Sequence, residues 1–205
     1  MKKRGVLAII SGFSGAGKGT IVNKLVSEYP YALSISATTR SPREGEVDGV
    51  NYFFKTKEEF EQLIAEDEFI EYATYVGNYY GTPKSYVMAQ LDAGKDVLLE
   101  IEMQGALKVK EKLPEVALIF ITPPTAEELK NRLVGRGTET SDVIEKRMQR
   151  AKEECVYMDK YDYIMINDDL DECVKEIHEL LQTLHHTTPN QKEFIADITK
   201  QLHDL

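Results

Sequence analysis

Four short, continuous apolar runs stand out along the chain, and each has the length of a strand that is buried on both faces. Stretches with the period of an amphipathic helix separate most of these runs. Alternation of buried strands with helices predicts an α/β fold, in which helices flank a parallel sheet. The predicted strands are residues 6–10, 97–101, 116–121 and 163–166.

Helix starts are marked by capping boxes, in which a Ser or Thr side chain and a later Glu or Gln satisfy free backbone N–H groups. Thr56 with Glu59 and Thr125 with Glu128 have this pattern, and each pair precedes an apolar helical face. Further apolar stripes predict helices that face the core. These stripes are Ile21, Val22, Leu25 and Val26; Ile144, Met148, Ala151 and Cys155; and Leu170, Cys173, Val174, Ile177, Leu181 and Leu184.

Between residues 38 and about 91 the pattern changes to short polar and aromatic strands around one helix, which we interpret as an inserted lobe. This lobe divides a core of residues 1–37 and 92–184. A second irregular stretch, residues 135–141, holds two glycines between two predicted helices. Such a stretch is typical of a mobile lid, which we place at about residues 135–147.

The tail, residues 185–205, has a predicted capping box of its own, Thr188 with Gln191, and one apolar face. We expect a helical extension that packs on the body of the protein or on a partner, because an apolar face favours burial. The face consists of Phe194, Ile198, Leu202 and Leu205.

Length and composition favour one compact soluble unit. The chain has 205 residues, 42% hydrophobic and 29% charged, and no stretch approaches the ~18 apolar residues of a membrane helix. The basic start and the apolar run after it are too short for a signal peptide. Cys155 and Cys173 lack CxxC spacing and are expected to be reduced core thiols, so we predict a cytoplasmic protein without membrane association.

The net charge of −10 argues against a general nucleic-acid binder, which would present a basic surface to the phosphate backbone. Any phosphate chemistry therefore depends on local clusters of cations. The arginines do cluster along the sequence, as Arg40 with Arg43, Arg132 with Arg136, and Arg147 with Arg150.

Residues 12–20 form a glycine-rich segment that follows a predicted buried strand and opens a helix, the context that a phosphate-binding loop requires. Glycines let backbone N–H groups wrap an anion, the helix N-terminus adds partial positive charge, and Lys18 bridges the terminal phosphates. The alternative is a glycine-rich turn with an exposed lysine. The predicted triphosphate site consists of Gly12, Phe13, Ser14, Gly15, Ala16, Gly17, Lys18, Gly19 and Thr20.

One position departs from the common loop pattern, which has Ser or Thr directly after the lysine to hold Mg²⁺. Gly19 stands there, and Thr20 follows it. We therefore expect phosphates and water to hold most of the Mg²⁺ shell, with Thr20, Glu100 and Glu102 as candidate protein contacts. Glu100 and Glu102 alternate with apolar residues at a predicted strand end, so both carboxylates are expected on one face. The alternative is a pair of partly exposed acids.

Arg40 and Arg43 stand either side of a proline in a turn, and two guanidinium forks at this spacing suit a single phosphate group. Tyr52 and Tyr80 carry hydroxyls that can donate to the same group. The alternative is a solvated, charged hairpin.

Glu71 falls on a predicted short strand with aromatic neighbours. A carboxylate accepts two N–H donors side by side, and guanine offers that pair on its N1 and N2 edge whereas adenine does not. This residue therefore favours guanine as the bound base.

Arg132 and Arg136 share a helix face at the edge of the predicted lid, and Arg147 lies at its return. Arginines brought in by lid closure stabilise the charge that spreads over a phosphoryl group in transfer. Each arginine alone is typical of a surface residue, but three around one glycine-rich lid favour a catalytic function.

Together these motifs resemble guanylate kinase, a family of nucleoside monophosphate kinases with a P-loop NTPase-type core. The resemblance covers roughly residues 5–184 in unbroken order and leaves out the tail. Family members often have Asp at the positions of Glu100 and Glu102, and commonly Ser at that of Thr82. The motifs are residues 12–20, 36–52, 68–71, 77–82, Gln104 with Gly105, and 135–139.

The resemblance implies that ATP with Mg²⁺ donates its γ-phosphoryl group to GMP, and to dGMP, giving ADP and GDP in purine nucleotide metabolism. It implies that the loop and Asn167 bind ATP, and that Lys18, Arg132, Arg136 and Arg147 are catalytic. The residues implied to bind GMP are Ser36, Arg40, Arg43, Glu46, Tyr52, Glu71, Tyr80, Thr82 and Glu100.

Two other functions fit part of the pattern. A scaffold protein with a guanylate-kinase-like domain that has lost catalysis would bind phosphopeptides at the arginine and tyrosine cluster. The intact Lys18 and the lid arginines favour an enzyme instead. The other alternative is a kinase for a different nucleoside monophosphate, since Glu71 speaks against adenine but not against every base.

Overall fold

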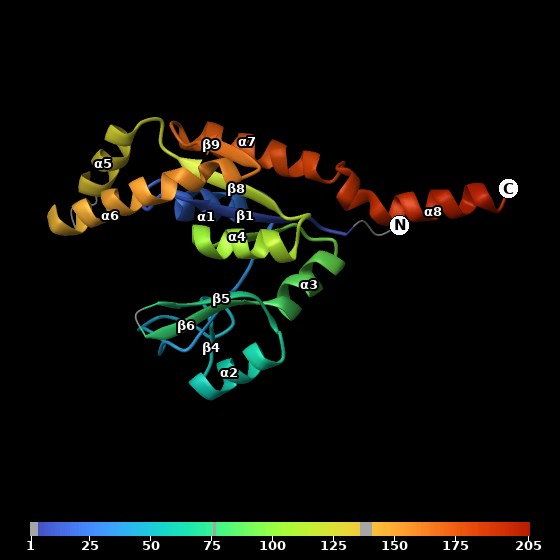
Figure 1. Ribbon diagram of the computed structural model, residues 1–205, viewed down its shortest axis with the longest axis horizontal. Coiled ribbons are helices and arrows are strands. Elements are labelled where there is room, and N and C mark those ends of the chain that lie inside the picture. The colour runs from blue at the N-terminus through green and yellow to red at the C-terminus, as the bar shows by residue number, and fades with distance from the viewer. Residues whose placement is uncertain (1–3, 76, 136–140) are drawn as a thin grey trace.

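The computed structural model describes residues 4–75, 77–135 and 141–205, and within them a five-stranded sheet forms the centre of the molecule (Figure 1). The strand order is β2-β7-β1-β8-β9, and all neighbouring strands run parallel. The four predicted strands are present, but the predicted burial of the last one is wrong, because β9 is an edge strand on which Ile164 and Ile166 are exposed. β2 was not predicted because two residues are too few to make a pattern. The strands are β1 (Leu7–Gly12), β2 (Ala32–Leu33), β7 (Val97–Glu100), β8 (Ala117–Thr122) and β9 (Tyr163–Ile166).

The central strands are buried on both faces, which explains their continuous apolar runs. Helix α1 (Lys18–Glu28) contacts α7 (Leu170–Leu184), and both bury the predicted apolar stripes. Helix α4 (Met103–Lys112) packs on β1 and β8. The remaining core helices are α5 (Ala126–Gly135), α6 (Ser141–Glu154) and the short 3₁₀ helix η1 (Cys155–Lys160). These elements confirm the α/β fold, a parallel sheet flanked by helices.

A second sheet, with strand order β4-β3-β6-β5, lies apart from the first and below it in Figure 1. Its strands are β3 (Ala37–Thr38), β4 (Phe53–Phe54), β5 (Phe69–Tyr75) and β6 (Asn78–Pro83), and it is joined by α2 (Lys57–Ala65) and α3 (Lys84–Asp92). The Phe60 ring is fully buried there and stacks on Phe69 and Tyr79, with ring centroids 4.3 and 5.1 Å apart. The polar and aromatic pattern of this segment thus corresponds to a small aromatic core of its own.

Of the three predicted capping boxes, that of Thr56 with Glu59 is confirmed in full, whereas that of Thr125 with Glu128 shows only the bond to the threonine hydroxyl, because the Glu128 carboxylate pairs with Arg132. The Thr56 hydroxyl accepts from Glu59 N–H at 3.1 Å while the Glu59 carboxylate accepts from Thr56 N–H at 2.8 Å, and the Thr125 hydroxyl accepts from Glu128 N–H at 3.0 Å. The predicted box of Thr188 with Gln191 is wrong. Residues Thr188–Gln191 form a 3₁₀ turn, η2, and the Gln191 amide donates to the His185 carbonyl instead.

The tail ends in α8 (Lys192–His203), which extends from the body as an arm (Figure 1). None of its residues is buried, so the expectation that it packs on the body is wrong. Cys155 was also expected in the core, but α6 ends one residue earlier and the thiol is exposed on η1. Cys173 is buried as expected, and its burial raises the pKa of the thiol to about 11.

Among the residues that the structure describes, no helix combines the length and the apolar character needed to cross a bilayer.

Replacement of Phe60 by alanine is expected to lower the free energy of unfolding by about 3–5 kcal/mol, because it leaves a cavity between two stacked rings. Urea unfolding followed by circular dichroism measures this loss. The matched control is Val50→Ala, at a side chain 66% exposed, which should change stability by less than about 0.5 kcal/mol. A loss as small as that of the control would show that the aromatic stack does not stabilise this part of the chain.

Candidate active site

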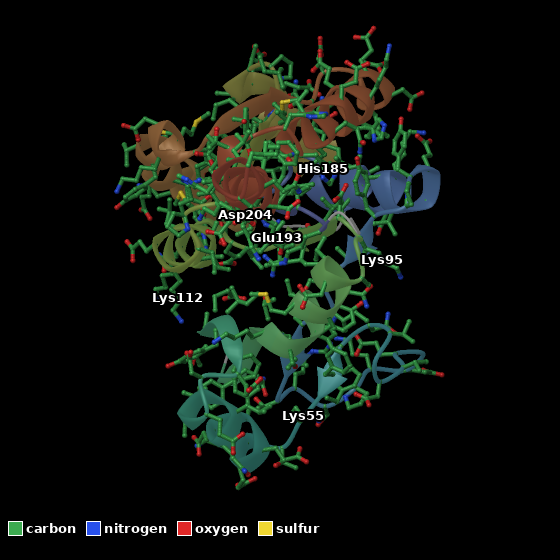
Figure 2. The ribbon with its side chains drawn as sticks, turned by 90° about the vertical axis from the view of Figure 1, so that its right-hand side faces the viewer. Lys55, Lys95, Lys112, His185, Glu193 and Asp204 are labelled. Carbon is green, nitrogen blue, oxygen red and sulfur yellow. The ribbon has the colours of Figure 1, made fainter. Side chains whose placement is uncertain are left out.

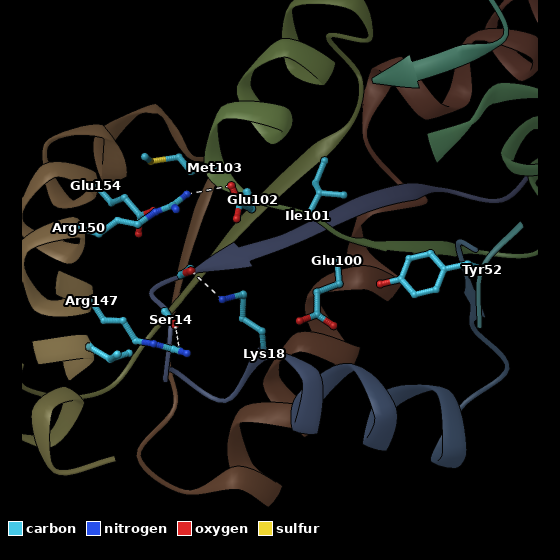
Figure 3. A pocket seen from close by; sticks show the side chains of 12 residues that line it. Ser14, Lys18, Tyr52, Glu100, Ile101, Glu102, Met103, Arg147, Arg150 and Glu154 are labelled. Atoms are coloured by element: carbon cyan, nitrogen blue, oxygen red, sulfur yellow. Dashed lines mark hydrogen bonds and ion pairs between the residues drawn. The ribbon is translucent and has the colours of Figure 1, made fainter. Parts of the chain in front are cut away.

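A cavity of about 680 Å³ opens at the carboxyl ends of β1 and β7, where open parallel sheets bind their ligands (Figure 3). In the sheet, β2 and β7 lie on one side of β1, and β8 and β9 lie on the other side. The chain passes from β1 to β2 in one direction and from β7 to β8 in the opposite direction, so the direction of the connections switches here. The cavity is lined by Gly12, Ser14, Lys18, Tyr52, Glu100, Ile101, Glu102, Met103, Val143, Arg147, Arg150 and Glu154.

The glycine-rich loop leads from β1 into α1 and has the conformation that an anion site requires. Gly17, the N-cap of α1, has a φ of 93°, a left-handed value that favours glycine. A Cβ atom there would also lie only 2.5 Å from the Asn167 amide nitrogen. The Lys18 ammonium donates to the Gly12 and Phe13 carbonyls at 2.8 and 3.0 Å, so it lies over the loop and faces the cavity.

Asn167 follows β9 and is buried, with 6% of its surface exposed. Its side-chain amide donates to the Ala16 carbonyl at 2.8 Å and so links the loop to the end of the edge strand β9. The sequence indicated Asn167 only as an ATP-binding residue. In the structure, the hydrogen bond from Asn167 to Ala16 also holds the shape of the loop.

Glu100 and Glu102 line the same cavity, but the expectation that they share one face of a strand is wrong. β7 ends at Glu100, and Glu102 is already the N-cap of α4, so the strand alternation stops between them. The Glu100 carboxylate lies beside Gly19, where an added Cβ would be 3.8 Å from both oxygens. Desolvation in the cleft raises the pKa of Glu100, and the positive charge of Lys18 opposes that rise.

Helix α6 brings two arginines to the cavity. The Arg147 guanidinium donates to the Ser14 hydroxyl at 2.6 Å, which connects the predicted lid to the loop. Arg150 donates to Glu102 and to Glu154, at 2.9 Å in each case (Figure 3). Arg132 does not line this cavity and pairs with Glu128 on its own helix at 2.7 Å. Arg136 lies outside the described residues.

The acceptor cluster, which consists of Arg40, Arg43, Tyr52 and Tyr80, is carried by the second sheet and by the loop between its strands β3 and β4. The Arg40 guanidinium lies over the Tyr52 ring at 5.4 Å, and the rings of Tyr52 and Tyr80 are 6.1 Å apart. Glu46 accepts from the Arg40 side chain at 2.8 Å and from Arg43 N–H at 2.7 Å. These bonds, above all the one from Arg40, lower the pKa of Glu46. Glu46 therefore organises the turn that carries the two arginines.

Glu71 on β5 and Thr82 on β6 are paired in register across the antiparallel strands. The fully buried Thr82 hydroxyl donates to the Glu71 carboxylate at 2.8 Å. Gly105 approaches the same group closely, since a Cβ there would be 3.2 Å from the other carboxylate oxygen. Desolvation raises the pKa of Glu71, and the bond from Thr82 counteracts only part of that rise.

Beside this pair is a second cavity of about 140 Å³, which Ser36 and Thr82 also line. Sequence reasoning did not single out Ser34, whose buried hydroxyl has no hydrogen-bond partner among the described residues. It also assigned no role to Asn51, Glu154 or Arg150. Arg150 lies three positions after Arg147 on α6, and this helical spacing is the signal that points to it. Ser34 lies between β2 and β3, outside any strand, so no periodic pattern points to it.

No group of three or more His, Cys, Asp or Glu side chains within the described part of the chain is arranged to hold a metal ion. The carboxylate of Glu100 beside the loop is nevertheless an oxygen ligand of the kind that Mg²⁺ accepts. The donor set therefore fits an ion that takes most of its ligands from phosphates and water.

Comparison with known proteins agrees with this geometry. The sequence model described as guanylate kinase matches residues 4–184. The guanylate kinase of Caldanaerobacter subterraneus is 56% identical over 182 residues, 88% of each chain. That of Bacillus subtilis is 54% identical over 187 residues, 90% of this chain and 92% of the relative.

Among solved structures, the guanylate kinase of Anaplasma phagocytophilum superposes with a TM-score of 0.70 at 35% identity, covering 91% of this chain and 89% of the other. Residues 4–184, which the family model matches, include the loop, the acceptor cluster and both arginines of α6, whereas the arm lies beyond them. The chain belongs to the guanylate kinase family.

Proposed function

We propose that the chain transfers the γ-phosphoryl group of ATP to GMP, and to dGMP, giving ADP and GDP for purine nucleotide metabolism. One observation carries this proposal. The cavity at the glycine-rich loop and the smaller cavity beside Thr82 share Tyr52, Glu100 and Ile101 as lining residues. A triphosphate on the loop and a guanine beside Thr82 would therefore adjoin. The proposed partners of the protein are these nucleotides rather than nucleic acid. We place the protein in the cytoplasm, because its two cysteines form no disulfide.

On the donor side, the loop amides and Lys18 hold the β- and γ-phosphates of ATP. The Lys18 ammonium now donates to two loop carbonyls, so it is already within reach of an anion seated on the loop. The N-terminus of α1 adds its partial positive charge. Asn167 keeps the loop in its binding shape through the bond to Ala16.

On the acceptor side, residues 38–91 act as a lobe that binds GMP. Arg40, Arg43, Tyr52 and Tyr80 hold its phosphate, and the contacts of the Tyr52 ring with the Arg40 guanidinium and the Tyr80 ring support this assignment. Glu46 holds the two arginines in place. The base contacts are made by Ser36, Glu71 and Thr82, with Glu100 at the junction of the two cavities.

The ionised Glu71 carboxylate selects guanine. One of its oxygens already accepts from Thr82, and a carboxylate has lone pairs left to accept guanine N1–H and N2–H. Adenine presents a bare acceptor at N1, so it would not supply the pair of donors that guanine offers to the desolvated carboxylate of Glu71. The loss of these bonds at a buried charge is the physical basis of discrimination.

During transfer, Arg147 stabilises the charge on the moving group from α6, next to Ser14 on the loop. Arg132 and Arg136 complete the cationic surroundings when the lid, residues 135–147, closes and excludes water. The GMP phosphate is already ionised and needs no strong general base, so positioning and charge account for most of the acceleration.

Mg²⁺ bound to the phosphates would neutralise part of their charge. Among the acids of the cavity, Glu100 is the candidate metal contact that we favour, because its carboxylate lies beside Gly19 of the loop. Thr20 lies one position farther along α1, and Glu102 is engaged by Arg150. Most of the ion's ligands would come from phosphate and water.

Lys18→Ala is expected to keep the fold and lower kcat by on the order of 100- to 1,000-fold, since it removes a cation from charge that grows in the transition state. A coupled assay of ADP release measures turnover, and circular dichroism checks the fold. Lys24→Ala is the matched control on the same helix, where the half-buried Lys24 pairs with Glu28 and Asp171. Normal turnover of the Lys18 variant would remove this residue from the mechanism.

Guanine selection depends on Glu71. In a panel of nucleoside monophosphates, the wild-type protein with ATP and Mg²⁺ is expected to turn over GMP fastest. Glu71→Gln should lower kcat/KM for GMP by on the order of 100-fold, because each bond to a charged acceptor is worth about 1.5–3 kcal/mol. Equal wild-type turnover of AMP or UMP would exclude the guanine assignment. Absence of turnover with every acceptor would favour a phosphopeptide-binding scaffold.

Burial raises the pKa of Glu71, and only its ionised form accepts both guanine N–H groups. As the pH falls through that raised pKa, Glu71 takes up a proton, and KM for GMP is expected to rise at a pH above the usual range of a glutamate. The phosphate group of GMP also takes up a proton as the pH falls through about 6. Steady-state kinetics of Glu71→Gln separate the two effects, since the variant retains the titration of the phosphate only. An identical pH profile of KM in both proteins would contradict this prediction.

A further inference from the structure

Helix α6 turns one face toward the large cavity, and four of its residues line that cavity at spacings of four, three and four. These residues are Val143, Arg147, Arg150 and Glu154. The proposed transfer uses Arg147 and leaves Arg150 without a role. In Figure 3 the Arg150 side chain lies between Glu154 and Glu102 and reaches toward the start of α4.

The Arg150 guanidinium joins α6 to α4. Its Nη2 donates to Glu102 and its Nε to Glu154, each at 2.9 Å. The Glu154 side chain is only 15% exposed and lies on the same helix, so it orients the planar guanidinium toward Glu102. Three charged groups on two elements form a network, which contributes more than an isolated surface pair does.

Glu102 is well placed to receive this contact. It is the N-cap of α4, where the positive end of the helix dipole favours a negative charge. Within the described residues, its side chain makes no capping bond to the helix. The carboxylate is therefore available to Arg150, and the bond ties α6 to a fixed point at the edge of the central sheet.

Apolar packing alone holds α6 weakly. Among the described residues of this helix, Ala151 is the only one that is buried, and Met148 is partly buried against the core. An element with few buried apolar contacts moves easily, so polar contacts have more influence on how it lies. On the cavity side these contacts are the bond from Arg147 to Ser14 and the bond from Arg150 to Glu102.

The arm α8 gives α6 no support. It leaves the body at the end far from α5 and α6 (Figure 1). Figure 2 views the molecule from that end and shows α8 nearly end-on, with Glu193 and Asp204 labelled on it. The position of α6 thus depends on its own contacts with the loop and with α4.

We infer that Arg150 is a positioning residue for the proposed phosphoryl transfer, and that it acts by holding α6 against the N-terminus of α4 through Glu102. Arg147 precedes it by three residues, so both side chains leave the same face of the helix. With α6 held at Glu102, the Arg147 guanidinium stays at Ser14, beside the site that the loop offers to phosphates. This inference rests on the proposed function.

Direct contact of Arg150 with a nucleotide is the alternative. Two carboxylates already accept from its guanidinium, and both line the cavity beside it. A phosphate at this point would meet the negative charges of Glu102 and Glu154 together with the single positive charge of Arg150. The local charge therefore favours a bridge between helices over a phosphate contact.

Replacement of Arg150 by alanine is expected to lower kcat by on the order of tenfold and to change KM for ATP and GMP by less than about twofold. A displaced Arg147 loses stabilisation of the transition state, whereas the binding contacts of the loop and the lobe remain. Lys152→Ala is the matched control, because it removes the same charge from α6 at a side chain that lines the cavities toward α5. Steady-state kinetics should show this control to be like the wild type.

Exchange of the two charges separates a bridge from a direct role of either group. Arg150→Glu alone should lower kcat at least as much as Arg150→Ala. Arg150→Glu combined with Glu102→Arg should recover most of that loss, because an arginine on α4 would again face carboxylates on α6. A direct contact of Arg150 with phosphate would not be restored by this exchange.

Docking of α6 can also be measured without turnover. The chain contains no tryptophan, so Val143→Trp adds a single fluorophore on the cavity face of α6. In this background Arg150→Ala is expected to increase quenching of the emission by acrylamide, and Lys152→Ala to leave it unchanged. The exchanged pair should return quenching to the level of the parent.

Equal kcat of Arg150→Ala and Lys152→Ala would overturn the inference, and so would equal quenching in the two variants. A raised KM with unchanged kcat would make Arg150 a nucleotide contact instead, and an exchanged pair no more active than Arg150→Glu would exclude the bridge. Absence of wild-type turnover with every acceptor would refute the proposed function alone. Quenching would then still decide whether the pair holds α6.

Discussion

The bond from the Asn167 amide to the Ala16 carbonyl, together with the left-handed backbone of Gly17, holds the glycine-rich loop in the shape on which the site depends. Both features arise at the carboxyl ends of parallel strands. The loop follows β1 and Asn167 follows β9, so the order of strands brings together residues about 150 positions apart along the chain. A side chain at position 17 would collide with the Asn167 amide, and the loop would have to open.

Around this loop the site is assembled from parts that the chain places on separate elements. The second sheet supplies the paired Glu71 and Thr82, and α6 supplies Arg147. The overall charge is strongly negative, yet the cations gather at the carboxyl edge of the central sheet and on the turn that Glu46 braces. Local positive charge in a negative protein matches a small anionic ligand better than an extended polyanion.

Local sequence was sufficient wherever function depends on a few consecutive residues. The loop around Lys18, the capping box at Thr56 and the turn with Arg40 could all be predicted, because backbone conformation and side-chain chemistry are set there by neighbours in the chain. Prediction failed at Glu102 and Thr188. Strand alternation does not continue into the first turn of α4, and the Gln191 amide bonds to the His185 carbonyl rather than capping a helix.

The sequence by itself determined the α/β architecture and the glycine-rich loop, and it predicted guanine as the base, since these follow from hydrophobic period, glycine conformation and the donor pattern that one carboxylate accepts. Only the tertiary structure decided that Arg150 engages Glu102, that Ser34 lines the small cavity and that the arm leaves its apolar stripe uncovered. The reason is physical: these features depend on distances between elements remote in the chain, and no local pattern of residues encodes such distances.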